Sequence, residues 1–96
     1  MNSHEQDELI GRIYRYKTAD RNRLSFLDAE LSTAACLFKK ASSQMEALLA
    51  RQPSEIEPVL SRIDVNHILQ LLAERAQIQR RIAEANEQLR GLGVRP

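Results

Sequence analysis

The residues best suited to chemistry form a basic segment between Arg12 and Arg23 that also contains two tyrosines. Arginine and lysine bind phosphates, and aromatic rings stack on bases, so this composition is typical of a nucleic-acid contact. The segment therefore predicts a nucleic-acid-binding regulator as an alternative function for the chain. Its candidate residues are Arg12, Tyr14, Arg15, Tyr16, Lys17, Arg21 and Arg23.

The charge balance of the whole chain weakens this nucleic-acid interpretation. Fourteen basic and 13 acidic residues give a net charge of +1, so no overall field attracts the protein to a polyanion. The sequence also lacks the spacing of a helix-turn-helix motif or a zinc finger. We therefore favour a partner-binding or solvated face for the basic segment.

No pattern in the sequence predicts catalytic residues, metal ligands or a cofactor site. Four residues after His67 stands the apolar Leu71, where a helical metal site would need a second ligand. Cys36 has no glycine-rich turn nearby that would supply an oxyanion site. The sequence therefore does not predict an enzyme.

Composition also gives an expectation for the cellular compartment. Cys36 is the single cysteine, which fits a reducing environment. The polar and acidic residues 1–9 do not resemble a secretory signal, and no apolar run approaches the roughly 20 residues of a membrane span. We expect a cytoplasmic protein that does not bind membranes.

The basic segment belongs to a stretch that predicts one long helix over 4–51. Residues 3–6 have the form of a capping box, and no proline occurs before Pro53. Thr18 offers a second helix start, which would bend the segment near 17–19. Whether 4–17 continue the long helix or fold back as a separate helix stays open at this point.

A heptad pattern on this helix predicts a coiled-coil-like seam. Traced backward in the same register, the pattern meets Ile10, Ile13, Lys17 and Asp20, so two charges interrupt the apolar stripe. The regular seam positions are Leu24, Leu27, Leu31, Ala34, Phe38, Ala41, Met45 and Leu48.

The remainder of the chain predicts a short connecting helix over 54–62 and a second long helix over 64–91. Asp64 is a suitable N-cap, and two glycines near the end suit helix termination. Arg75 occupies a seam position, where it either meets Asp20, Glu30 or Glu46 or extends its head to solvent. The second seam consists of Ile68, Leu71, Arg75, Ile78, Ile82, Ala85, Leu89 and Leu92.

These elements predict a single all-α domain over 1–96, folded as a long antiparallel helical hairpin. Further apolar residues lie to one side of each seam, where one facing helix cannot cover them. A homodimer forming a four-helix bundle would supply the missing surface. The protein-interface candidates are Phe26, Leu37, Val65, Leu69, Leu72 and Ala76.

The preferred function is therefore a non-enzymatic protein-protein interaction module that acts through apolar helix faces. An adaptor, a small chaperone and a helical inhibitor all fit this description, and the sequence does not separate them. The expected partners are a second copy of the chain and another protein.

Overall fold

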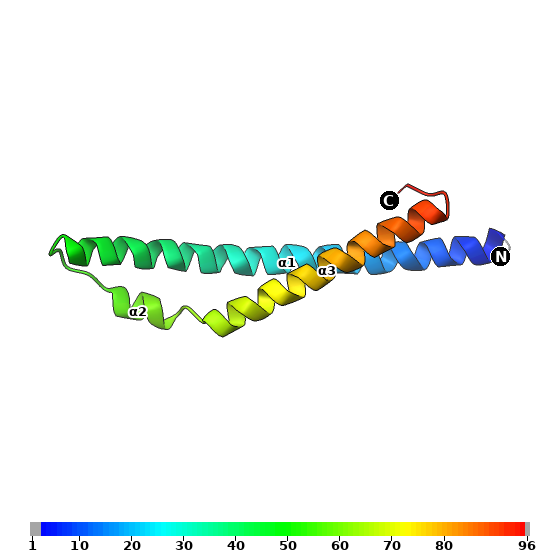
Figure 1. Cartoon of the computed structure of the whole chain (residues 1–96). Helices are drawn as coiled ribbons and strands as arrows, with labels where there is room; N and C mark the ends of the chain where they lie inside the picture. Colours follow the sequence, from blue (N-terminus) through cyan, green and yellow to red (C-terminus); the bar gives the residue numbers. More distant parts are fainter. Residues whose placement is uncertain (1–2, 96) are drawn as a thin grey trace. The chain divides into compact units, whose positions relative to one another are not determined.

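The described part of the chain is helical, as a computed structural model of residues 3–95 shows (Figure 1). Helix α1 spans Ser3–Leu49, α2 spans Ile56–Ser61 and α3 spans Val65–Gly91. No strand occurs within residues 3–95. The predicted all-α class is confirmed.

The packing of these helices divides the chain into two compact units. Unit 1 combines the chain up to Leu27 with the chain from Ala73 onward, so it contains the N-terminal part of α1 and most of α3. Unit 2 is Asp28–Leu72, which contains the remainder of α1, all of α2 and the first turns of α3.

Helix α1 is continuous through residues 17–19, where Thr18 offered a second start. Residues 3–17 therefore extend the long helix and do not form a separate one. The helix ends in a Schellman motif: the Gln52 N–H donates to the Ala47 carbonyl at 2.8 Å, and the Arg51 N–H donates to the Leu48 carbonyl at 3.0 Å. Arg51 takes the left-handed conformation at the C′ position, with φ of 59°.

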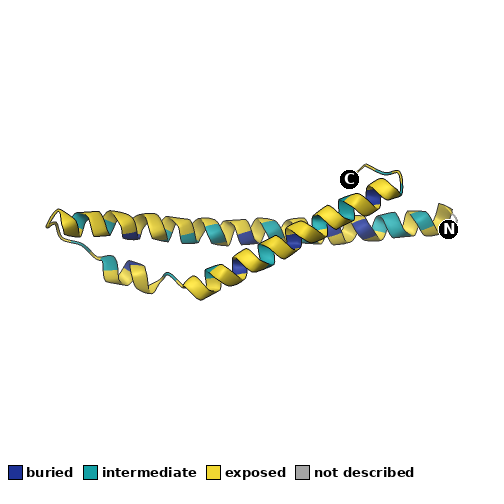
Figure 2. Ribbon diagram, viewed as in Figure 1, coloured by how far each residue is buried: buried dark blue, intermediate teal, exposed yellow. Residues whose placement is uncertain are grey.

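Unit 1 is an antiparallel pair of helices, as predicted for the hairpin. The Gln6 side chain donates to the Leu92 carbonyl at 3.1 Å, while Arg23 bonds Glu74. Rising residue numbers in α1 thus face falling numbers in α3. The buried apolar side chains of this unit, dark blue in Figure 2, are Ile13, Leu27, Ile78 and Leu89.

The seam of unit 1 keeps its register through the two charged positions on α1. Lys17 is only 3% exposed, and the half-buried Asp20 forms a double hydrogen bond with Arg81, with N–O distances of 2.8 and 3.2 Å. Methylene groups of a long side chain fill an apolar seam as well as an aliphatic residue does. The line of side chains that packs against α3 is therefore continuous along this part of α1, although two of its residues are charged.

Unit 2 has a smaller core, and polar contacts hold its connection between α1 and α2. Ser54 Oγ donates to the Gln44 carbonyl at 3.1 Å, and the Gln44 side chain accepts from the Glu55 N–H at 3.1 Å. These bonds attach the connection to the last turns of α1. The residues that unit 2 buries are Ala41, Val59 and Leu71.

The predicted seam of α3 agrees with the structure at all eight positions, each of which is buried or half-buried. The predicted seam of α1 fails near its end, where Phe38 is 48% exposed and Leu37 is half-buried in its place. The facing element here is the start of α3: Leu37 lines a groove with Ile68 and Leu71, so the line that packs inward lies one residue before the heptad position.

Candidate interaction surfaces

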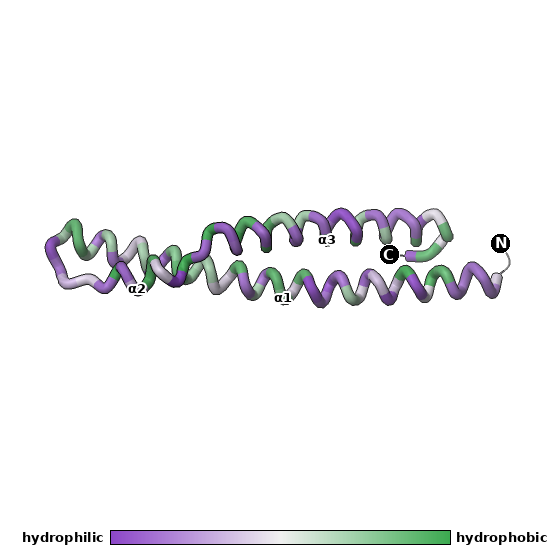
Figure 3. Tube along the Cα trace, turned by 90° about the horizontal axis from the view of Figure 1, so that it is seen from below, coloured by the Kyte–Doolittle hydropathy of each residue, from purple (hydrophilic) through white to green (hydrophobic). Residues whose placement is uncertain are grey.

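The first candidate surface is an apolar line on the first turns of α3, in unit 2. Val65 and Leu69 are more than half exposed, and Leu72 is 46% exposed. Figure 3 shows apolar positions recurring in green along these turns. Their spacing of four and three residues places them on one helix face, beside the seam that packs within the chain. Ala76, one turn further along α3, is also exposed.

The start of this surface is fixed by a helix cap. Asp64 Oδ1 accepts a hydrogen bond from the His67 N–H at 3.0 Å, as expected of an N-cap side chain. The cap satisfies one of the free N–H groups of the first turn and so stabilises the helical conformation of the residues that carry the line. The inward packing of Ile68 and Leu71 leaves Val65 and Leu69 on the exposed side.

The second candidate surface lies on the last turns of α1, also in unit 2. Phe38, Met45 and Leu48 are about half exposed, at 48%, 47% and 50%, and Leu49 is 86% exposed. The sequence placed the first three in the seam and assigned none of them to an interface. The signal that could have found them is the shortness of the segment 54–62, which cannot cover a seam of this length.

The two interface candidates on α1 have different surroundings. Phe26, in unit 1, is half exposed, and the guanidinium carbon of Arg23 lies 4.8 Å from the centre of its ring. This distance permits a cation–π contact. Leu37, in unit 2, is half-buried beside Ile68 and Leu71 in a groove of about 140 Å³. Leu37 therefore belongs largely to the core of unit 2.

The basic segment is partly occupied by contacts within unit 1. Arg23 forms two hydrogen bonds with Glu74, at 2.7 and 3.0 Å, and the Tyr14 hydroxyl donates to the Arg95 carbonyl at 2.6 Å. Lys17 is buried. The remaining members of the segment are exposed: Arg12, Arg15, Tyr16 and Arg21.

The contact with Arg23 also changes the acidity of Glu74. The hydrogen bond from Arg23 is the main cause that holds the pKa of Glu74 below its ordinary value of 4.5, with smaller attractions from Arg23 and Arg81. Burial of the carboxylate acts in the opposite direction. Both side chains remain more than a third exposed, so the pair contributes little to stability.

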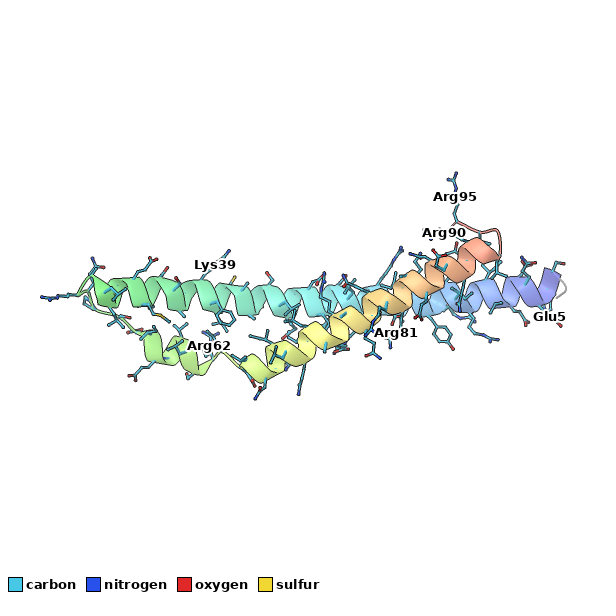
Figure 4. All side chains as sticks on the ribbon, in the orientation of Figure 1. Glu5, Lys39, Arg62, Arg81, Arg90 and Arg95 are labelled. Atoms are coloured by element: carbon cyan, nitrogen blue, oxygen red, sulfur yellow. The ribbon has the colours of Figure 1, made fainter. Side chains whose placement is uncertain are left out.

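Lys17 lines a groove of about 340 Å³ in unit 1, between α1 and α3. Burial of the ammonium group, followed by repulsion from Arg21 and Arg90, lowers the pKa of Lys17 from its ordinary value of 10.5. Arg81 projects from α3 and Arg90 lies near the end of that helix (Figure 4). The other residues of the groove are Ile13, Tyr16, Asp20, Arg81, Glu84, Ala85 and Gln88.

The described residues do not form a metal site or a membrane-spanning helix. Residues 3–95 contain no cluster of three or more histidine, cysteine, aspartate or glutamate side chains arranged to hold a metal ion. Cys36 is a free, exposed thiol. No helix within the described part of the chain combines the length and apolarity needed to cross a membrane.

Comparison of the chain with models of protein families, with curated proteins and with solved structures finds no match.

Proposed function

We propose that the protein is a non-enzymatic protein-protein interaction module whose apolar helix faces in unit 2 pack against helices of another chain. The observation that carries this proposal is that unit 2 exposes more large apolar side chains than it buries. The residues it buries are one alanine, one valine and one leucine. Its exposed large apolar side chains are Phe38, Met45, Leu48, Leu49, Leu60, Val65, Leu69 and Leu72. Apolar side chains gathered in this way are typical of an interaction site.

The occupant to which we commit is a second copy of the chain, in a dimeric four-helix bundle. A chain of 96 residues buries a modest share of its surface when alone, and two-fold dimers are the commonest oligomers. In such a bundle each helix has two neighbours, so each needs two apolar lines. Both α1 and α3 carry a second line within unit 2, as this arrangement requires.

The biological roles that fit are those of an adaptor, a small chaperone or a helical inhibitor. The line of Val65, Leu69 and Leu72 has the spacing by which one amphipathic helix recognises another. A cytoplasmic location suits the exposed thiol of Cys36, which stays reduced there.

The alternative of a nucleic-acid-binding regulator receives less support. Of its seven candidate residues, Lys17 is buried, Arg23 bonds Glu74 and Tyr14 bonds the Arg95 carbonyl. A phosphate-binding face requires cations whose heads are available to the ligand. The burial of Lys17 and the two contacts within unit 1 therefore reduce the surface that this function would use.

Sedimentation equilibrium of the full chain over a wide range of concentrations tests the proposal. We expect a mass near twice the 11.0 kDa of the chain, and a dissociation constant raised about tenfold or more by Leu69→Asp, which places a charge on the apolar line. Gln70→Asp is the matched control on the exposed side of the same turn, and it should leave the mass unchanged. A monomer at every concentration would contradict the proposal.

A further inference from the structure

Helix α1 carries two side-chain lines in unit 2, and only one of them packs within the chain. The inward line is formed by Leu37, Ala41 and Gln44, which are buried or half-buried. At 100° per residue, the exposed line is rotated from it by about 100°. That rotation suits a helix with two neighbours in a bundle. The exposed line consists of Phe38, Ser42, Met45 and Leu49.

The two flanks of the exposed line differ in chemistry. The flank nearer the core of unit 2 is apolar, with Ala41 and Leu48. The opposite flank carries one positive and one negative charge, Lys39 and Glu46, seven residues apart and both exposed. Figure 4 shows Lys39 projecting from α1 on the side away from α2. An apolar inner flank and a charged outer flank are typical of a helix at the rim of a bundle.

The order of the two charges suits an antiparallel second copy of α1. If two copies cross about a two-fold axis near residues 43 and 44, Lys39 of each copy lies close to Glu46 of the other. Two equivalent ion pairs then form, while Phe38 packs on Leu49 of the second copy. A parallel pairing would place both charges opposite alanines, with no counter-charge.

We propose that Phe38, Ser42, Met45 and Leu49 form a self-association surface that binds a second copy of α1 in antiparallel orientation, with reciprocal Lys39–Glu46 pairs. This inference rests on the proposed function and specifies which face of unit 2 makes the dimer. The remaining apolar line, on α3, packs against the second copy and completes the four-helix bundle.

Charge reversal tests the orientation. Lys39→Glu and Glu46→Lys each convert two attractive contacts into two repulsive ones, so each raises the dissociation constant of the dimer roughly tenfold. The double variant K39E/E46K restores both pairs in reversed sense and returns the constant to within about threefold of the original value. Lys40→Glu, on the far side of α1, is the matched control and leaves dimerisation unchanged.

Cysteine crosslinking tests the register, in a Cys36→Ser background. Ser42→Cys lies next to the two-fold axis, offset from its copy by about 5 Å along the helix, and a short bismaleimide links the two. Leu49→Cys is offset by about 16 Å and stays unlinked. Circular dichroism checks that each variant retains its helix content.

The outcomes separate this inference from the proposed function. A dimer that crosslinks through Leu49→Cys, as a parallel pair would at both positions, or that ignores the charge reversals, overturns the antiparallel pairing and leaves the proposed function standing. A monomer at every concentration overturns both. Crosslinking at Ser42→Cys together with rescue by K39E/E46K supports the inference.

Discussion

At the scale of single residues, the most unusual feature is Lys17 in the seam of unit 1. Its side chain is 3% exposed, and its ammonium group lies in the field of Arg21 and Arg90. Desolvation of the ammonium group and repulsion from these two arginines oppose folding, compared with an apolar side chain of similar length. The methylene groups of Lys17 fill the seam, but its charged group reduces the stabilisation that this packing provides. Lysine is therefore not the most stabilising residue at this position.

Replacing Lys17 by methionine should raise the melting temperature by a few degrees at neutral pH, because the stem is kept and the charge is removed. The sign of the pH dependence follows from the lowered pKa: between the folded value and 10.5, the unfolded chain binds the proton more tightly. Stability of the unmodified protein therefore rises as the pH rises through that window.

Thermal unfolding of both proteins from pH 7 towards pH 10.5 should show their melting temperatures converging. Lys40→Met, at an exposed position on the same helix, controls for the loss of one charge and should change little. A lower melting temperature for Lys17→Met at neutral pH would show that the ammonium group stabilises the fold.

At the scale of the elements, both long helices end in the same hydrogen-bonding motif. Arg51 and Gly93 occupy its left-handed C′ position, with φ of 59° and 77°, and a bond from the next N–H reaches back to the carbonyls of Ala47 and Leu89. Glycine adopts this conformation at no steric cost, whereas a residue with a Cβ does not. The end of α1 is therefore less favourable than the end of α3.

Arg51→Gly should stabilise the protein by up to about 1 kcal/mol by relieving the strain of the left-handed conformation. The converse change, Gly93→Ala, should destabilise by a similar amount, although there is open space around a Cβ at that position. Urea unfolding of the three proteins measures both effects. Equal midpoints for the original chain and Arg51→Gly would show that the turn tolerates arginine without strain.

The elements also show which parts of the fold the sequence could predict. The seam of α3 was predictable because one long helix covers it throughout, so Ile78 and Leu89 are buried where the heptad pattern places them. The end of the α1 seam was not predictable in this way. Heptad spacing gives the positions that could face another helix, but it does not identify the element that covers them. Leu37 therefore replaces Phe38 on the inward line.

The candidate surfaces were predicted only in part, because the heptad pattern does not identify the element that covers each helix face. Val65, Leu69 and Leu72 lie on a line distinct from a well-defined seam, and the structure shows them exposed. Met45 and Leu49 were not assigned to a surface, although the shortness of the segment 54–62, in which α2 spans six residues, indicates that this part of α1 stays uncovered. The burial of Lys17 follows from a register that the sequence does contain, although its charge argues against a core position.

At the scale of the whole molecule, the proposed dimer links stability to concentration. Partner binding to the folded chain alone stabilises it by mass action, so a hundredfold rise in concentration above the dissociation constant adds about 2.7 kcal/mol. The melting temperature should therefore rise with protein concentration. Met45→Asp should remove this dependence, because it places a charge in the middle of the exposed line on α1.

Calorimetry at several concentrations measures this effect, and Gln70→Asp serves as an exposed control that keeps the dependence. A melting temperature that is independent of concentration in the original protein would contradict a folded dimer.

The bond between Gln6 and the Leu92 carbonyl has a mechanical consequence. Because residues near both ends of the chain are held together in unit 1, a force applied at the two ends pulls α1 and α3 apart like a zipper. Contacts then break one after another, so each rupture needs little force. An optical trap attached at the ends should record low-force opening, whereas handles at Gln6 and Gln52 should load α1 along its axis and meet greater resistance.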